Sequence, residues 1–184
     1  MFGKKKQQRQ VLIDMADKQK RYEALVNVYH KELYRFAYWL AGDPTVAEDL
    51  VQETFLRAWR SLDSLLDQQA AKAWLITILR RENARRFERK QFDYSDVEQD
   101  TLCDTQTLDM EQNAERSQLQ KRIMQLDEEY REPLLLQVVM GFSGDEIASI
   151  LSLNKNTVMT RLFRARNQLK DNLQPRLQRG INNG

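Results

Sequence analysis

The stretch "GFSGDEIASILSLNKNTVMTRLFRARNQL", residues 141–169, decides the fold. Ser143, followed three residues later by Glu146, forms a capping-box pattern and predicts the start of a helix. The apolar residues on the inner face of this helix are Ile147, Ile150 and Leu151. A three-residue turn, "SLN", then leads into a second segment with helical periodicity.

Asn154 is a good N-cap for the second helix. The apolar stripe of that helix consists of Val158, Leu162, Ala165 and Leu169. Small Ala148 at the turn, with Ile147 and Val158 meeting behind it, is typical of a helix-turn-helix. The outward N-terminal half carries the polar and basic residues Lys155, Asn156, Thr157, Thr160, Arg161 and Arg164. Such side chains bind base edges and phosphates, so we expect this helix to contact duplex DNA.

Charge alone would not support that expectation, because basic residues on a helix more often form a solvated face. The turn length, the small residue and the order of apolar positions favour the helix-turn-helix. This motif occurs in repressors, response regulators and sigma factors, so it does not by itself define the function.

Length and composition limit the remaining possibilities. A chain of 184 residues holds one domain or two small ones. It is 41% hydrophobic and 30% charged, and no apolar run approaches the roughly 20 residues that cross a bilayer. The basic start is followed by a segment too short and too acidic for a signal peptide. We expect a cytoplasmic protein without membrane contact of its own.

Cys103 and His30 are the single cysteine and the single histidine. One cysteine excludes an internal disulfide framework and a thiolate zinc site built from this chain alone. With no second histidine to complete a metal cluster or a nucleophile with its base, an enzyme has almost no support. We expect no metal, no cofactor and no catalytic residue.

The formal net charge of +2 conceals a strong segregation along the chain. Residues 72–90 hold seven basic and two acidic residues, and residues 151–179 hold seven basic and one acidic. Between them, residues 91–115 hold eight acidic residues and no lysine or arginine. A polar, acidic stretch without helical period is typical of a linker. The predicted organisation is a basic N-terminal tail at 1–19, a domain at 20–90, an acidic flexible linker at 91–115, a domain at 116–175 and a C-terminal tail at 176–184.

Helical periodicity dominates both domains, and no convincing alternating strand occurs. The first predicted helix ends at "AGDPT", where Gly42 and Pro44 break it and Asp43 or Thr45 can cap the next. The remaining predicted helices cover about 45–62, 70–90, 116–127, 131–140 with Pro133 in its first turn, 144–151 and 155–170. The predicted fold class is all-α, with two small helical domains.

Three segments in order, "AEDLVQETFLRAWRSL", "AAKAWLITILRRENARRFERK" and the helix-turn-helix stretch, resemble RNA polymerase sigma factors of the extracytoplasmic-function class, in the sigma-70 family. The resemblance covers about residues 20–90 and 117–171. It implies a first domain that binds core polymerase and the −10 promoter element and a second that binds the −35 element. The implied function is promoter-specific transcription initiation with assistance in promoter melting. The implied partners are core RNA polymerase through its β′ clamp helices and β flap, promoter DNA, and an anti-sigma factor.

The family's core-docking motif is matched by Asp49, Leu50, Gln52, Glu53, Phe55 and Trp59. We expect one of the two aromatic residues to be mostly buried, while Asp49, Gln52 and Glu53 offer a polar, acidic edge to a partner that presents arginines.

In the next segment, Trp74 and Leu75 match the family's Trp-Leu pair, and Trp74 is predicted to lie in the core. Family members usually carry asparagine seven positions beyond that tryptophan, where this chain has Arg81; the nearest asparagine is Asn83. The predicted −10 DNA-binding residues are Arg80, Arg81, Asn83, Arg85, Arg86, Arg89 and Lys90. Phe87 and Phe92 are available to stack on unpaired bases.

In the second domain, two positions of the recognition helix depart from the family pattern. Asn156 stands where glycine is frequent, and Met159 stands where a basic residue is frequent. Of the arginines, Arg161 and Arg164 are the strongest candidates for DNA contact. Arg166 is predicted to pair with Asp145 or Glu146 on the neighbouring helix.

A stand-alone helix-turn-helix regulator is the alternative interpretation. Its N-terminal half would be a helical dimerisation or sensing domain, and it would bind its operator without polymerase. A sigma factor of this class is not expected to do so.

Overall fold

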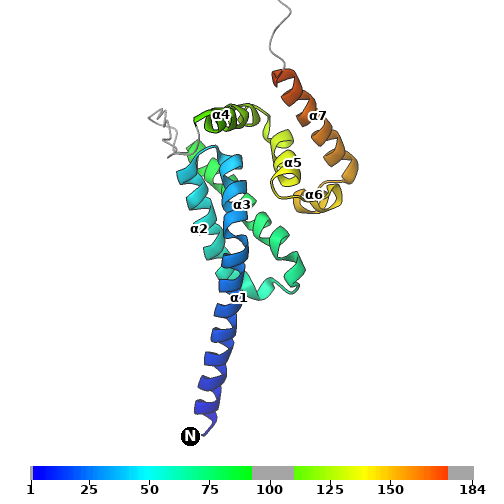
Figure 1. Ribbon diagram of the computed structural model, residues 1–184. Coiled ribbons are helices and arrows are strands. Elements are labelled where there is room, and N and C mark those ends of the chain that lie inside the picture. Colours follow the sequence, from blue (N-terminus) through cyan, green and yellow to red (C-terminus); the bar gives the residue numbers. More distant parts are fainter. Residues whose placement is uncertain (1, 93–109, 174–184) are drawn as a thin grey trace, which may run out of the picture. The chain divides into compact units, whose positions relative to one another are not determined.

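The computed structural model describes the backbone of residues 2–92 and 110–173 and the side chains of residues 16–89 and 117–171 (Figure 1). All elements in these ranges are helices, and the ranges contain no strand. The chain divides into two compact units, one formed mainly by α1 to α3 and the other mainly by α4 to α7. The all-α prediction with two helical domains is confirmed. The middle of the predicted linker lies outside the described residues.

The first helix, α1 (Phe2–Ala41), is longer than predicted and begins inside the segment predicted as a basic tail. Lysine, glutamine, arginine and leucine, all good helix formers, fill its early turns, and neither glycine nor proline occurs between Lys4 and Ala41. The helix ends where predicted, since Gly42 has a φ of 76° and Pro44 is the first residue of α2.

The rest of the N-terminal unit consists of α2 (Pro44–Ser61), the 3-10 helices η1 (Leu62–Ser64) and η2 (Gln68–Ala70), and α3 (Ala71–Phe92). Helices α1, α2 and α3 pack side by side (Figure 1). Their shared core includes Leu33, Phe36, Val51, Leu75, Ile76 and Leu79, each at most 2% exposed. Burial of such side chains is the main stabilising contribution to a helical unit of this size.

The C-terminal unit consists of α4 (Met110–Met124), α5 (Glu128–Val138), α6 (Gly144–Leu151) and α7 (Lys155–Leu173). Helix α4 begins inside the segment predicted as linker. Helix α5 begins three residues before its predicted start, so Pro133 lies in its second turn and not in its first. The backbone N–H groups of Tyr130 and Arg131 donate to the carbonyl of Asp127, which closes the first turn before the proline is reached.

Helices α6 and α7 form the predicted helix-turn-helix. At the start of α6, the Ser143 hydroxyl accepts from the Glu146 N–H and the Glu146 carboxylate accepts from the Ser143 N–H, so the capping box is confirmed. The Asn154 side chain accepts from the Thr157 N–H at 2.8 Å and caps α7, as predicted. Between them Ser152 adopts the left-handed conformation, with φ 54° and ψ 42°.

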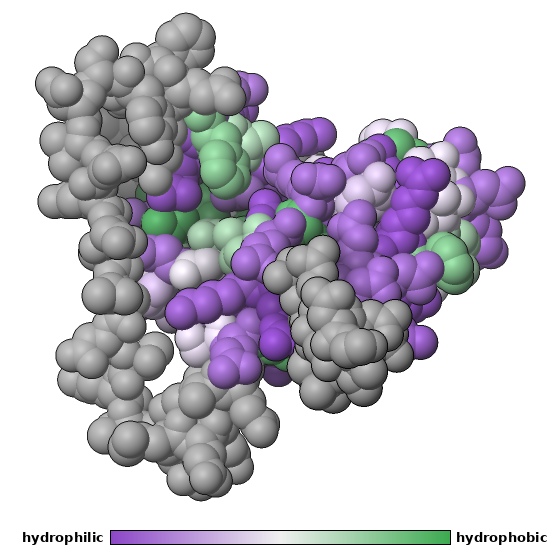
Figure 2. Space-filling view, turned by 90° about the horizontal axis from the view of Figure 1, so that it is seen from above, coloured by the Kyte–Doolittle hydropathy of each residue, from purple (hydrophilic) through white to green (hydrophobic). Residues whose placement is uncertain are grey.

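Apolar side chains of α5, α6 and α7 meet in one core, whose innermost members are Leu135, Leu136, Ile147, Val158, Leu162 and Ala165. Much of the surface visible in Figure 2 is hydrophilic, with apolar residues in smaller patches. Among the described residues, no helix has the length and apolar character needed to cross a membrane.

Candidate functional site

The outward face of α2 carries polar and acidic side chains. Asp49 and Gln52 are exposed and Glu53 is half-buried. Leu50 and Phe55 are only 3% and 5% exposed, because they point into the core. Phe55 therefore supports the helix from inside and offers almost no contact surface, contrary to its prediction. Leu50, although mostly buried, still lines the groove between α2 and α3, so its role in polymerase contact stays a prediction.

Leu56 belongs to the same outward face and was not predicted. It is 52% exposed and follows Asp49, Gln52 and Glu53 at the spacing of one helix face. The signal that identifies it is this spacing, since a leucine seven residues after Asp49 falls two turns along the same face. We call Asp49, Gln52, Glu53 and Leu56 the α2 face.

Trp59 is 36% exposed, whereas Phe55 is buried, so the expectation that one of the two would be mostly buried is confirmed. Tyr22 of α1 packs edge-on against both rings, at centroid distances of 6.2 Å to Phe55 and 5.1 Å to Trp59. Burial against these rings raises the pKa of the Tyr22 hydroxyl. The Lys18 ammonium lies 5.5 Å from the Trp59 ring centroid. Trp59 thus keeps only part of its ring available to a partner.

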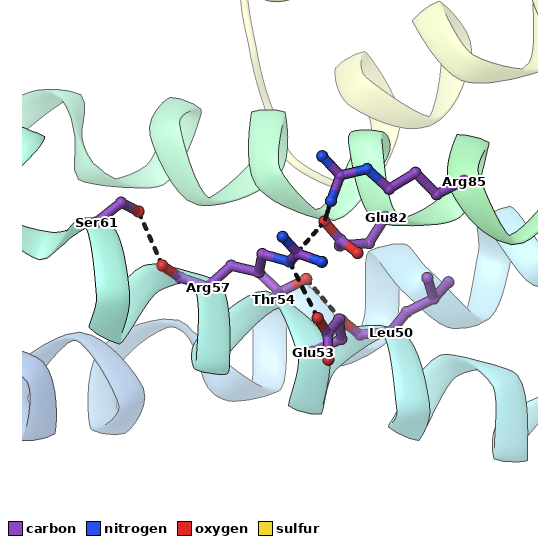
Figure 3. Close-up of polar contacts among 7 residues, drawn as sticks. All are labelled: Leu50, Glu53, Thr54, Arg57, Ser61, Glu82 and Arg85. Carbon is purple, nitrogen blue, oxygen red and sulfur yellow. Dashed lines mark hydrogen bonds and ion pairs between the residues drawn. The ribbon is translucent and has the colours of Figure 1, made fainter.

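An ion-pair network connects α2 with α3 (Figure 3). Arg57 Nε lies 3.0 Å from Glu53 Oε1 and 3.1 Å from Glu82 Oε1. Arg85 Nη1 lies 2.8 Å from the same Glu82 oxygen. Glu82 is only 8% exposed, and a buried charge needs partners. Arg57 of α2 and Arg85 of α3 supply them.

A groove of about 550 Å³ runs between α2 and α3. Its lining includes the acidic and polar residues Asp49, Gln52 and Glu53 on one side and Arg85, Arg86 and Arg89 on the other. Four of the six predicted docking residues and three of the predicted −10 residues therefore line one groove, whose α2 side is acidic and whose α3 side is basic apart from Glu82.

The predicted −10 residues do not all share one environment. Arg81, Arg85 and Arg89 are exposed, and Arg80 and Arg86 are half-buried. Asn83 is 3% exposed, and its Oδ1 has no hydrogen-bond partner in the structure. It points inward because its place on α3 falls on the core side, so its prediction as a surface DNA contact is corrected. The side chains of Lys90 and Phe92 are not among those that the structure describes.

The aromatic residues of α3 differ in the same way. Trp74 is partly buried and packs on the small cluster of Leu62, Leu65 and Ala71, in agreement with its predicted place in the core. Phe87 is 41% exposed. Of the two described aromatic residues of this helix, Phe87 is thus the more exposed one.

On α7, the predicted DNA-binding cations are held by partners within the C-terminal unit. Lys155 Nζ lies 2.9 Å from Asp145 Oδ2, and Arg161 Nη2 lies 3.1 Å from Glu129 Oε2. Arg164 is exposed and donates a long bond of 3.4 Å to the Tyr130 hydroxyl.

Arg166 was predicted to pair with Asp145 or Glu146, and this prediction is wrong. Its guanidinium donates to the side-chain carbonyl of Gln137 on α5. Asp145 instead forms an ion pair with Lys155, and the Glu146 carboxylate accepts the Ser143 N–H in the capping box.

Two uncharged residues predicted for DNA, Asn156 and Thr160, are exposed, and Thr157 is half-buried. Within the residues that the structure describes, no group of three histidine, cysteine or acidic side chains is arranged to hold a metal ion.

Comparisons with known proteins agree with this arrangement. Residues 25–93 match sigma-70 region 2, and residues 116–169 match sigma-70 region 4. The chain is 37% identical over 142 residues to the extracytoplasmic-function sigma factor EcfG of Rhodopseudomonas palustris, covering 74% of this chain and 76% of that protein. It is 34% identical over 156 residues to the sigma factor SigL of Mycobacterium tuberculosis, covering 82% and 88%.

A solved structure, the sigma factor RpoE of Bartonella quintana in complex with the anti-sigma factor NepR, is also similar. The TM-score is 0.69 at 29% identity, over 87% of this chain and 99% of that one. The matches include both helical units and all three motif segments. The chain therefore belongs to the extracytoplasmic-function class of RNA polymerase sigma factors.

Proposed function

We propose that the α2 face docks on core RNA polymerase, that the exposed cations of α3 contact the −10 element, and that α7 reads the −35 element. The observation that carries this proposal is the division of charge within the N-terminal unit. The outward side of α2 is acidic and polar, whereas the adjacent side of α3 is basic. A protein that only bound DNA would gain nothing from an acidic edge beside its DNA surface, because that edge repels phosphate.

The proposed mechanism is binding without chemistry of its own. The chain joins core polymerase, positions it on two promoter elements and uses binding energy to hold melted bases, with Phe87 available for stacking. RNA synthesis belongs to the polymerase, and the chain acts in the cytoplasm. We retain 20–90 and 116–175 as the proposed limits of the two functional domains.

We further propose that core binding uses the β′ clamp helices and the β flap, and that an anti-sigma factor regulates the chain. The second proposal is supported by the similarity to a sigma factor solved with its anti-sigma factor.

In vitro transcription tests the function directly. With purified core polymerase and a library of genomic promoter fragments, we expect defined start sites only when both core and this chain are present. Core alone is the control. Sequence-specific binding of the chain to DNA without core, combined with no start sites in its presence, would favour the stand-alone regulator.

A narrower prediction separates Arg161 from Arg164. Arg164 is the more exposed of the two and has only a long bond to Tyr130, so we assign it to base reading. Arg164→Ala should cost roughly 1–3 kcal/mol and relax preference at one −35 position. Arg161 is paired with Glu129, and Arg161→Ala should weaken all sequences alike and lower the salt slope by about one.

The measurement is binding of the full chain with core polymerase to a promoter and its single-base −35 variants at several salt concentrations. Lys170→Ala, an exposed cation at the end of the same helix, is the matched control for charge. If neither arginine variant changes specificity or salt slope, the assignment of α7 as recognition helix fails.

A further inference from the structure

One face of α7 mixes polar and apolar side chains. Asn156, Met159, Thr160 and Phe163 follow one another at positions i, i+3, i+4 and i+7, which lie together on a helix. All four are exposed, Met159 at 48% and Phe163 at 64%. Asn156 and Thr160 belong to the proposed −35 surface, but the two apolar residues have no assigned role.

The polar members of this face have limited capacity to read bases. The Thr160 hydroxyl donates to the Asn156 carbonyl at 2.9 Å, so its hydrogen is already used inside the helix. The Asn156 amide is then the source of side-chain N–H donors on the face. Lys155 and Arg164 lie on its two flanks; Lys155 is paired with Asp145 of α6, and Arg164 donates a long bond to the Tyr130 hydroxyl of α5. The centre of the face therefore offers mainly apolar contact.

Met159 is supported by the scaffold without being covered. A Cβ placed on Gly144, the first residue of α6, would lie 3.4 Å from the Met159 sulfur, so the thioether rests against the start of that helix. An unbranched thioether adapts its shape to the group that it meets. The side chain is thus held at the helix-turn-helix while almost half of it remains exposed.

The cations beside the apolar centre suit the phosphates of a polyanion, and the apolar centre itself suits an apolar group that the polyanion presents between them. In the major groove of DNA, the apolar group on a base edge is the C5-methyl of thymine. We propose that Met159, with Phe163 beside it, contacts a thymine C5-methyl in the −35 element and makes this chain select thymine at that position. The inference rests on the proposed role of α7. It also predicts that the chain differs in −35 preference from relatives with a basic residue at this position, since a cation favours guanine or phosphate.

The test replaces each −35 thymine, one at a time, by deoxyuridine, which lacks only the methyl group. Binding of the full chain with core polymerase to promoter DNA is measured. One replacement should weaken binding about four-fold, the factor for withdrawing one buried methyl-sized group. In Met159→Ala the same replacement should have no effect. Val138→Ala, which removes an apolar side chain 71% exposed on α5, is the matched control and should keep the four-fold difference.

The outcomes separate this inference from the proposed function. Absence of promoter-specific transcription with core would refute the function itself. Normal transcription with no response to any deoxyuridine, or with an undiminished response in Met159→Ala, would overturn the role of Met159 alone. A −35 element without thymine on either strand would do the same. Circular dichroism of Met159→Ala should match the unmodified chain, because the residue is exposed.

Discussion

Reversing two charges on the α2 face, Asp49→Arg together with Glu53→Arg, should abolish association with core polymerase. Asp49 is exposed and makes no ion pair with another described residue, and Glu53 is only partly engaged by Arg57. If both carboxylates meet arginines of the polymerase in a desolvated interface, removing each pair costs about 2–5 kcal/mol, and repulsion adds to it. Affinity should fall at least ~100-fold.

The fold should survive this change. Glu53 loses a partly exposed pair with Arg57, worth at most about 1 kcal/mol, and Arg57 keeps Glu82 as a partner. The measurement is competition with the unmodified chain for core polymerase, with circular dichroism as a check of folding. Asp17→Arg with Glu23→Arg changes the net charge equally at exposed sites of the same unit and should leave core binding unchanged. Undiminished association of the α2 double variant would count against the docking surface.

The second large effect is expected from Leu162→Ala in α7. The side chain is fully buried where α7 packs on α5 and α6. Removing it leaves a cavity and costs about 2–5 kcal/mol. A unit of roughly 60 residues has a stability of about 3–9 kcal/mol, so the C-terminal unit should lose most of its stability. Transcription that depends on the −35 element should be lost, while association with core through α2 is retained.

Urea unfolding can locate this loss, because the two units carry different probes. Trp39 belongs to the C-terminal unit, so the experiment is done in a Trp39→Phe background, in which the remaining tryptophans, Trp59 and Trp74, lie in the N-terminal unit. Circular dichroism should show an early transition that tryptophan fluorescence does not follow. Gln168→Ala, at an exposed position of the same helix, should change neither curve. Coincident transitions in Leu162→Ala would show that the two units do not unfold independently.

The sequence predicted the elements that depend on local signals. The capping box at Ser143, the N-cap at Asn154 and the break at Gly42 each involve residues within one turn of each other, and all three are confirmed. The extension of α1 to Phe2 was missed, because its charge was interpreted as a tail although its helix propensity is high.

Predictions of particular contacts were less successful, because they depend on which elements pack together. The family resemblance placed Asn83 with the arginines as the asparagine nearest to the usual position, but its angular position on α3 turns it into the core. Arg166 contacts Gln137, a residue of α5 that periodicity on α7 cannot locate. Leu56 was missed for a different reason. It is not among the residues that match the docking motif, although the helical spacing alone identifies it as part of the exposed face.

The shared carboxylate of Glu82 has a mechanical consequence for the proposed roles of α2 and α3. Arg57 of α2 pairs with Glu82 of α3, and Arg85 holds the same carboxylate oxygen from α3 itself, so an oriented ion pair joins the two helices in addition to their apolar packing. The angle between the proposed polymerase-facing and DNA-facing surfaces is then set during folding. The two helices therefore lose little further conformational freedom when the chain binds a promoter. A stiff part of this kind acts as a template, so the strain of opening the duplex falls on the DNA, whose strands must move to fit it.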